Sequence, residues 1–365
     1  MTQQISRTER FRGVISGTAV GDSVGLPAEG ISRTRAQKLF KGPWRHRLLY
    51  FPGTKRKYFG MVSDDTEHTV FVAQSLLAHP DSPALFAKRL SRCLRWWLVS
   101  VPAGIGFATL RSVFRLWAGI SPAKSGVFSA GNGPAMRSAP IGAFFASDTG
   151  QLDAYLEAST NITHTDPKAL TGAKAIAYLT AWTVRENLAE RPCPDDFLEI
   201  LGSAGQDEEW TELVSLVSSA VEQHFSVSRF ADSLGLSNGI TGYVYHTVPV
   251  VVYAWYLHFG NFEETLSAVL DCGGDTDTTG AIVGALAGAV VGEQGIPGDW
   301  LEGIWEWPRG IKVLRKIADA LEAKSRFETG NLMPVRYFRP GIIFRNLFFL
   351  ATVLLHGFRR LLPPY

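Results

Sequence analysis

Two short segments combine hydroxyl and carboxylate side chains in a pattern that could bind a cation. Residues 273–280 read GGDTDTTG and end where a long apolar stretch begins, and residues 63–66 read SDDT ahead of an amphipathic segment. A single acid at such a position often serves only as a helix cap, favoured by the positive end of the helix dipole. Several carboxylates that converge, however, repel one another and tolerate this best with a cation between them.

If these two helix ends face each other, six oxygen donors carrying four negative charges come together. Oxygen donors without cysteine or histidine favour Mg²⁺ or Mn²⁺ over Zn²⁺, and two divalent ions neutralise four carboxylates. The sequence therefore predicts a two-metal site. Its ligands are Ser63, Asp64, Asp65, Asp275, Asp277 and Thr278.

Three further segments carry weaker signals. Residues 21–29, GDSVGLPAE, contain Asp22, for which a structural role as a helix cap or a loop brace is favoured. They also contain Glu29, an acid that follows a proline and could exchange a proton with a substrate, unless it is a solvated surface side chain. Residues 102–107, PAGIGF, and 128–137, FSAGNGPAMR, hold glycine turns, whose backbone N–H groups can bind an anion such as a pyrophosphate.

Helical periodicity dominates the elements that must position these side chains. Apolar residues recur at three- and four-residue spacing in several windows, and no series of alternating strands is evident. We therefore predict one compact all-α domain with long functional loops. The windows are Glu67–Ala78, Lys168–Ala189, Glu209–His224 and Phe262–Leu270.

The apolar stretch after the second acidic segment has a glycine at every fourth position. Gly280, Gly284, Gly288 and Gly292 would form a nearly smooth stripe on a helix, which lets another helix approach closely. The stretch is shorter than the roughly 20 residues that a membrane span needs. We predict a central, buried helix.

Bulk composition limits the classes of partner and compartment. The formal net charge of +2 does not indicate a nucleic-acid partner, and we expect none to bind stably. Cys93, Cys193 and Cys272 form no CxxC pair, which argues against a disulfide framework and a thiolate zinc site. The first 13 residues are polar and lack the apolar region of a signal peptide. We expect a cytoplasmic protein.

The last 31 residues differ in character from the rest of the chain. Residues 335–365 hold five arginines and no acid, a net charge of +5 against −3 for residues 1–334. We predict a catalytic domain over 1–334 and a basic, apolar helical tail over 335–365. Within it, residues 342–362 could form a helix docked on the body, an interfacial helix that gives weak membrane association, or, least favoured, a span.

Five of these segments, in this order, resemble the motifs of the ADP-ribosylglycohydrolase family, which includes the dinitrogenase-reductase-activating enzymes. They are GDSVGLPAE (21–29), SDDT (63–66), GNGPAMR (131–137), TH (163–164) and GGDTDT (273–278), and the resemblance covers about residues 10–310. Ser63 stands where the family usually has threonine, and its hydroxyl can still bind metal. Asp271 and Cys272 replace a usual asparagine and apolar residue, which removes no ligand.

The resemblance implies an all-α orthogonal bundle whose central cleft holds two Mg²⁺ or Mn²⁺ ions at the six ligand positions named above. It implies catalytic roles for Glu29, Asp65 and Asp275. The substrate-binding positions that it implies are Gly104, Gly106, Phe128, Ser129, Gly131, Asn132, Gly133 and His164. Taken by itself, a lone histidine such as His164 is more often structural than catalytic.

The implied activity is hydrolysis of the bond between ADP-ribose and a protein side chain, with arginine the favoured linkage. Such hydrolysis passes through an oxocarbenium-like state, which metal ions bound to the ribose hydroxyls could favour. Expected partners are an ADP-ribosylated protein and, in an immunity role, a cognate ADP-ribosyltransferase toxin. The alternatives are a non-enzymatic ADP-ribose-binding or toxin-blocking protein, and a hydrolase of nucleic-acid-linked or small-molecule ADP-ribose. The full ligand set together with Glu29 favours an enzyme.

Residues 41–60, KGPWRHRLLYFPGTKRKYFG, are not explained by this resemblance. Basic residues among aromatic ones can bind nucleic acid or a phosphorylated ligand. The same pattern also describes a loop whose aromatic side chains pack and whose charges are solvated. Because the segment lies between Glu29 and the first aspartate pair, our hypothesis is that it contacts the modified target.

Overall fold

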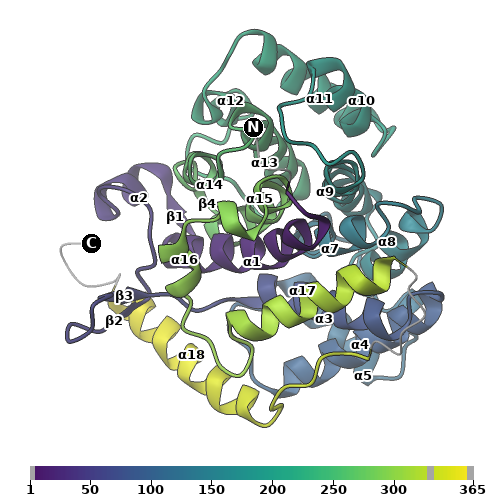
Figure 1. The fold of residues 1–365 in the computed structure, drawn as a ribbon, viewed down its shortest axis with the longest axis vertical. Coiled ribbons are helices and arrows are strands. Elements are labelled where there is room, and N and C mark those ends of the chain that lie inside the picture. The colour runs from purple at the N-terminus through teal and green to yellow at the C-terminus, as the bar shows by residue number, and fades with distance from the viewer. Residues whose placement is uncertain (1–4, 327–332, 360–365) are drawn as a thin grey trace.

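The chain folds almost entirely into helices, as predicted (Figure 1). The computed structural model describes residues 5–326 and 333–359. The longer helices are α1 (Arg7–Gly25), α3 (Asp64–Ala78), α4 (Pro83–Val99), α5 (Phe107–Trp117), α9 (Pro167–Arg185), α11 (Glu208–Glu222), α13 (Val244–Leu257), α15 (Thr276–Val291), α17 (Ile311–Ser325) and α18 (Gly341–Arg359). The shorter ones are α2 (Arg33–Leu39), α6 (Gly133–Met136), α7 (Ala139–Phe144), α8 (Leu152–Thr160), α10 (Pro194–Gly202), α12 (Val227–Ser233), α14 (Phe262–Leu270) and α16 (Gly298–Glu302), with 3₁₀ turns η1 (Leu26–Ala28), η2 (Pro122–Lys124) and η3 (Glu293–Gly295).

The four predicted helical windows correspond to α3, α9, α11 and α14. Two of these helices end earlier than predicted. Asn187 follows α9 with a φ of 52° and His224 follows α11 with a φ of 50°. A residue in this left-handed conformation ends a helix, and apolar periodicity alone cannot locate it.

A pair of helices joined by glycines forms the centre of the molecule (Figure 1). Gly280, Gly284 and Gly288 of the predicted stripe lie on α15, which is buried over nearly its whole length and faces a second stripe on α1. The fourth glycine, Gly292, lies just beyond the helix and ends it with a φ of 68°. A Cβ atom added at Gly17 would collide with the carbonyl oxygen of Gly284, and one added at Gly284 would collide with that of Gly17. The backbones are therefore in direct contact.

The order of these contacts fixes the direction of the two helices. Gly13 faces Gly288, whereas Gly25 faces Thr276, so α1 and α15 run antiparallel. The C-terminal end of α1 therefore lies beside the N-terminal end of α15. Helices α3, α9, α13 and α14 pack around α15, and α3, α7 and α17 pack around α1.

Two small antiparallel strand pairs complete the fold. Strand β1 (Ile31–Ser32) pairs with β4 (Gly273–Gly274), and β2 (Leu49–Tyr50) pairs with β3 (Tyr58–Phe59). Strands of two residues show no alternation, so the sequence did not indicate them. The first pair joins the loop after α1 to the segment that precedes α15.

The β2–β3 hairpin lies within the basic, aromatic segment 41–60. Its aromatic side chains pack in pairs, with ring centroids 5.1 Å apart for Tyr50 and Tyr58 and 5.6 Å apart for Phe51 and Phe59. Arg56 pairs with Asp299 and Glu302 on α16. This packing agrees with the structural interpretation of the segment, and contact with a target stays a prediction.

The C-terminal tail forms α18, which lies along the body of the protein (Figure 1). This arrangement matches the first of the three interpretations of the tail. Among the described residues, Gly341–Phe358 is also the one window long and apolar enough to cross a membrane, with 22% of it buried. The predicted boundary at 334 falls just after residues 327–332, which lie outside the described part of the chain.

Candidate active site

The first turn of α3 is held by a buried carboxylate from α1. Asp22 is completely buried, and its two oxygens accept hydrogen bonds from the backbone N–H of Ser63, each at 2.9 Å. The N–H and the hydroxyl of Thr66 donate to the same carboxylate. Asp22 therefore acts as the structural cap that the sequence favoured, and burial raises its pKa to about 6.

The two acidic segments meet at Asp65, as predicted for helix ends that face each other. The hydroxyl of Ser63 donates to Asp65 Oδ2 at 3.0 Å, and the hydroxyl of Thr278, at the start of α15, donates to the same oxygen at 3.3 Å. The other oxygen, Oδ1, is buried and has no hydrogen-bond partner. A buried carboxylate oxygen without a donor is costly unless a cation binds it.

Asp275 and Asp277 lie in the first turn of α15 but differ in their contacts. Asp277 is 5% exposed and accepts a hydrogen bond from the N–H of Thr278 at 2.9 Å. Asp275 occupies the N-cap position, yet its side chain makes no capping hydrogen bond. Its Oδ2 instead accepts a bond from the Asn132 amide at 2.7 Å. A capping role therefore does not account for Asp275.

The electrostatics show that these carboxyls share one small space. Burial, followed by the charges of Asp22 and Glu29, raises the pKa of Asp64 well above its usual value. Burial also raises the pKa of Asp65, with Asp64 as the next cause, and that of Asp277, with Glu29 as the next cause. At neutral pH the cluster therefore favours the uptake of protons or of cations.

Glu29 lies in an exposed loop at the edge of this cluster. The loop follows η1 and is attached to the segment before Asp275, because the N–H of Gly30 donates to the carbonyl of Gly274 at 2.8 Å. Its effect on the pKa of Asp64 and Asp277 places the Glu29 charge close to both. The structure thus brings this predicted catalytic acid beside the aspartates.

The predicted substrate-binding glycines fall into two groups. Gly104 has a φ of +77°, and a Cβ there would lie 3.9 Å from Asp64 Oδ1. Gly106 is exposed at the N-cap of α5, and a Cβ there would meet nothing within 4 Å. This loop therefore leaves open space next to the first acidic segment.

Gly131 and Gly133 enclose the ring of His164. A Cβ at Gly131 would lie 2.9 Å from His164 Nε2, and one at Gly133 would lie 3.1 Å from Cε1. His164 is 3% exposed, and burial, followed by the charge of Arg137, lowers its pKa to about 3. The imidazole is therefore neutral at physiological pH.

Residues 128–132 connect this glycine turn to the acidic cluster. Asn132 is held by a bond from its amide to the Thr247 hydroxyl at 3.0 Å, besides its bond to Asp275. Ser129 is partly exposed, and the Phe128 ring is 79% exposed. The loop thus presents one aromatic side chain to solvent and one amide to the cluster.

Arg137, at the end of the glycine-rich segment, has a place that sequence reasoning did not give it. It is completely buried behind the site and donates to the Thr163 hydroxyl at 2.7 Å and to the Ser159 carbonyl at 3.0 Å. Its charge stabilises the ionised form of Asp64. Arg137 is the last residue of the motif GNGPAMR, and its place in that motif was the sequence feature that could have identified it as a site residue.

The donor set fits divalent cations of the Mg²⁺ or Mn²⁺ type. The cluster combines carboxylates, two hydroxyls and an unpartnered buried oxygen, with no cysteine among them. Within residues 5–326 and 333–359, no three His, Cys, Asp or Glu side chains are already gathered as one chelating group. The six ligand assignments therefore stay predictions.

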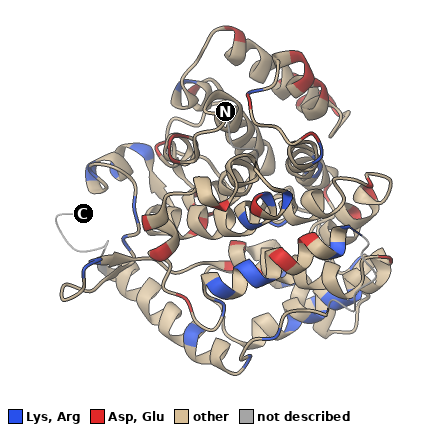
Figure 2. Cartoon of the chain, in the orientation of Figure 1, with Lys and Arg blue, Asp and Glu red and all other residues tan. Residues whose placement is uncertain are grey.

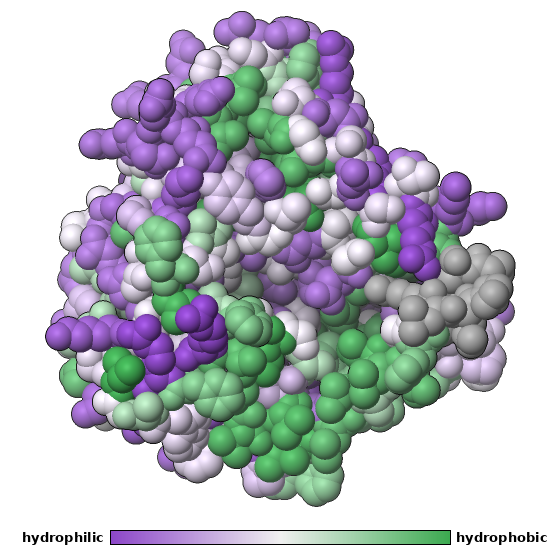
Figure 3. All heavy atoms as spheres, turned by 180° about the vertical axis from the view of Figure 1, so that it is seen from behind, coloured by the Kyte–Doolittle hydropathy of each residue, from purple (hydrophilic) through white to green (hydrophobic). Residues whose placement is uncertain are grey.

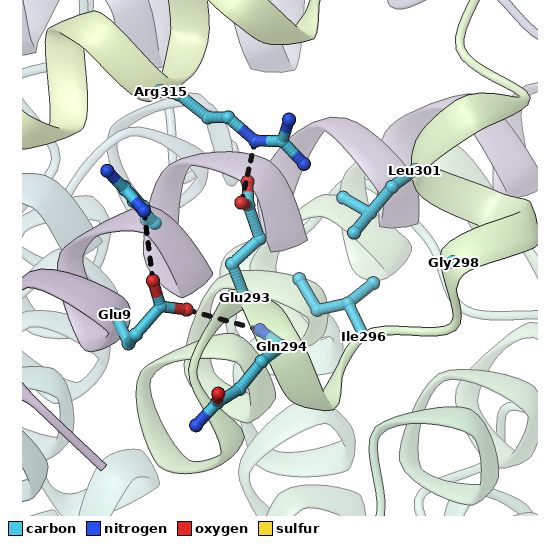
Figure 4. Close-up of a pocket in the computed structure, with 8 residues that line it drawn as sticks. Glu9, Glu293, Gln294, Ile296, Gly298, Leu301 and Arg315 are labelled. Carbon is cyan, nitrogen blue, oxygen red and sulfur yellow. Dashed lines mark hydrogen bonds and ion pairs between the residues drawn. The ribbon is translucent and has the colours of Figure 1, made fainter.

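A pocket of about 520 Å³ lies away from this cluster (Figure 4). Glu9 and Arg12 of α1 line it, roughly 15 to 20 Å along the helix from Asp22. Its charged side chains pair with one another: Arg315 with Glu293 at 2.7 Å, and Arg12 with Glu9 at 3.0 Å. The charged side chains that line the pocket are thus engaged in ion pairs with one another.

Comparison with known proteins identifies the fold and the family. The family model for ADP-ribosylglycohydrolase matches residues 3–329. The chain belongs to the ADP-ribosylglycohydrolase family. The family resemblance inferred from the five motifs is therefore confirmed, and the chain is an enzyme that hydrolyses a glycosidic linkage of ADP-ribose.

Relatives of the family align over most of their length. An uncharacterized protein of Archaeoglobus fulgidus is 32% identical, over 81% of this chain and 92% of its own. The ADP-ribosyl-[dinitrogen reductase] glycohydrolase of Rhodospirillum rubrum is 28% identical, over 86% and 95%. ADP-ribosylhydrolase ARH3 of Gallus gallus is 27% identical, over 80% and 88%.

A solved structure described as an ADP-ribosylglycohydrolase-related protein complex superposes with a TM-score of 0.63 at 26% identity. It covers 87% of this chain and 99% of its own. The all-α fold is thus that of the ADP-ribosylglycohydrolase family.

Proposed function

We propose that this ADP-ribosylglycohydrolase binds two Mg²⁺ or Mn²⁺ ions between the N-terminal ends of α3 and α15, and that it removes ADP-ribose from a modified protein side chain, with arginine the favoured linkage. The observation that supports metal binding is Oδ1 of Asp65, which is buried and has no hydrogen-bond partner. It lies within a group of carboxyls that raise one another's pKa. Bound ions would neutralise the carboxylates and fix the ribose hydroxyls of the substrate.

The surrounding residues divide the remaining tasks. Glu29 is the exposed acid beside the cluster, so it can exchange a proton at the glycosidic bond. Asn132 fixes the orientation of the Asp275 carboxylate. The neutral His164 supports the glycine turn above it and does not serve as an acid at pH 7, because its pKa is about 3. The open loop at Gly104 and Gly106 offers room for the pyrophosphate.

A protein substrate is supported by the relative in Rhodospirillum rubrum, which is named as a glycohydrolase of ADP-ribosyl-[dinitrogen reductase]. Basic residues lie on α2 and in segment 41–60, which follow the Glu29 loop in the chain (Figure 2). They suit a target with an acidic surface around the modified side chain. Reversal of a toxin's modification stays a prediction that needs a cognate toxin.

The test is release of ADP-ribose from arginine-ADP-ribosylated protein, with Mg²⁺ or Mn²⁺, with EDTA, and with the double variant Asp275→Ala plus Asp277→Ala. We expect release that EDTA and the double variant abolish. Asp195→Ala plus Asp196→Ala is the matched control, because it removes two exposed acids from the first turn of α10. If EDTA leaves the release of ADP-ribose unchanged, the proposed dependence on divalent metal ions is refuted.

The linkage is tested separately. Release from serine-linked or nucleic-acid-linked ADP-ribose, but not from arginine, would change the assigned linkage and keep the hydrolase. If none of the three substrates is hydrolysed but ADP-ribose binds with measurable affinity, the result would favour the alternative of a non-enzymatic ADP-ribose-binding protein.

A further inference from the structure

Three loops carry part of the predicted site residues, and we call them the site loops. They are residues 26–30, which carry Glu29; residues 60–65, which carry the first acidic segment; and residues 100–106, which carry Gly104 and Gly106. Each is a short connection at the end of a helix. All three lie against α18, an element beyond the residues 3–329 that the family model matches.

The second site loop is held to α18 by a buried ion pair. Arg345 is 6% exposed and pairs with Glu306, its Nε donating to Oε2 at 3.0 Å. The same guanidinium donates to the carbonyl of Val62, while the N–H of Val62 donates to Glu306 Oε1 at 2.9 Å. Both backbone groups of the residue before Ser63 are therefore bound by this pair.

The other two loops are held by neighbouring side chains of the same helix. Asn346 is completely buried, and its amide donates to the carbonyl and the hydroxyl of Ser100, each at 2.9 Å. His356 Nε2 donates to the carbonyl of Pro27 at 3.2 Å. Each bond ends two to four residues from a predicted site residue.

A small apolar cluster, separate from the main core, joins the same elements. Phe349 of α18 is 3% exposed and clusters with Leu26, Met61 and Ala103. Each of these three belongs to a different site loop. The polar contacts and the apolar contacts of α18 thus converge on the same backbone segments.

The orientation of α18 shows that these contacts are specific. An ordinary surface helix buries its apolar face and exposes its polar one. Helix α18 turns Arg345 and Asn346 inward and leaves Phe344 71% and Leu355 70% exposed. Apolar side chains gather along the lower edge of the molecule, where α18 lies (Figure 3). Burial of apolar area alone would not favour this orientation.

We propose that α18 positions the three site loops for catalysis, with Arg345, Asn346 and His356 as the positioning residues. The inference rests on the proposed function of the site. Without α18 each loop would sample a wider set of conformations, and displacement of a binding group by about 1 Å can cost roughly 100-fold in rate. The tail is then a part of the active site's support and not an appendage.

Two variants of the full chain test this proposal. Asn346→Leu removes both bonds to Ser100, and Arg345→Met with Glu306→Gln removes the buried pair without leaving one charge alone. Leu355→Ala is the matched control on the exposed face of the same helix. We expect kcat/KM for ADP-ribose release to fall by about 10- to 100-fold in the two variants, and to stay within twofold of the parent in the control.

Two readouts separate positioning from stability. We expect weaker ADP-ribose binding by calorimetry, and faster amide hydrogen exchange in residues 26–30, 60–65 and 100–106, at temperatures where all variants remain folded by circular dichroism. Arg345→Lys keeps the pairing with Glu306 and should restore part of the affinity. Variants with a lower melting temperature but unchanged affinity and loop exchange would overturn the proposal.

Failure of this proposal is distinguishable from failure of the proposed function. A parent protein that releases no ADP-ribose would refute the proposed hydrolase activity. ADP-ribose binding and amide hydrogen exchange would still show whether α18 orders the site loops. If the parent is active and the Asn346→Leu and Arg345→Met/Glu306→Gln variants match the Leu355→Ala control, only the role of α18 is refuted.

Discussion

At the scale of single residues, the site consists of carboxyls that the fold forces together. Asp22 and Asp65 are almost completely buried, and Asp65 keeps one oxygen without a donor. Such an arrangement lowers the stability of the metal-free protein, because like charges converge in a region shielded from water. Function at this site therefore conflicts with stability.

The pH dependence of stability should reveal this conflict. The pKa of Asp22 is about 6 in the folded chain against its ordinary value of 3.8. The contribution of Asp22 to the free energy of unfolding is therefore complete below pH 3.8 and is lost as pH rises through 6. Asp22 alone should favour the folded state at pH 5 over pH 8 by about 1 to 2 kcal/mol. We expect the rise in melting temperature on adding Mn²⁺ to be larger at pH 8 than at pH 5. A shift that is independent of pH would contradict the carboxylate cluster as the binding site.

Replacement of Asp65 should separate stability from activity. Asp65→Asn keeps an acceptor for the hydroxyls of Ser63 and Thr278 and removes one buried negative charge. We expect a melting temperature in EDTA equal to or above that of the parent, and a loss of ADP-ribose release of roughly 100-fold or more. Retained release with lower stability would identify Asp65 as a structural residue.

At the scale of elements, the contact of α1 with α15 aligns the site. Gly17 and Gly284 touch through their backbones, so neither position accepts a side chain. The antiparallel order then places Asp22 beside the first turn of α15. A shift between the two helices would therefore displace both acidic segments at once.

An added methyl group measures this contact. Gly17→Ala should destabilise the fold by about 3 kcal/mol, because backbone cannot move aside as a flexible side chain can. Gly202→Ala, where a Cβ meets nothing within 4 Å at the end of α10, should change stability by less than about 1 kcal/mol. Guanidinium denaturation measures the free energy of unfolding of both variants. Equal losses of stability would refute the close approach of α1 and α15.

The basic segment 41–60 can be tested as a contact for the target. Arg45 and Lys57 are exposed, whereas Arg56 is paired with α16. Arg45→Glu with Lys57→Glu should raise KM for an ADP-ribosylated protein several-fold and leave hydrolysis of a small arginine-linked ADP-ribose unchanged. An equal loss on both substrates would point to a local structural effect instead.

At the scale of the whole molecule, α18 leaves an extended apolar surface. Phe344, Leu355 and Phe358 are more than half exposed, and Trp305, near the same face, is 44% exposed. Exposed apolar surface of this extent often marks an interaction site. The five arginines of residues 335–365 give the same part of the chain a net charge of +5.

Weak membrane association through this surface stays a prediction and can be measured with vesicles. The full chain should sediment with vesicles that contain phosphatidylglycerol and not with neutral phosphatidylcholine vesicles, because basic residues favour anionic headgroups. Phe344→Glu with Leu355→Glu should abolish sedimentation, whereas Leu85→Glu with Phe114→Glu, at exposed apolar positions of α4 and α5, should not. If both double variants still sediment with the vesicles, α18 is excluded as the membrane-binding face.

The sequence by itself determined the helical class, the central glycine helix and the order of the five motifs. These features are local: periodicity, glycine spacing and short runs of chemically distinctive residues are all read within a few turns of chain. The meeting of Ser63 and Thr278 at Asp65 was also predictable, because two acidic helix ends have few other ways to be neutralised.

Tertiary structure alone decided the contacts between segments far apart in the chain. The pairing of β1 with β4 attaches the Glu29 loop to Asp275, and the buried Arg345 holds the backbone of Val62. The sequence predicted a basic, apolar helix in the tail but not that Arg345 and Asn346 on it face the body. Which face is buried depends on the partners that the rest of the fold supplies, here Glu306 and Ser100, and those partners are set by packing across some 40 to 250 positions of sequence.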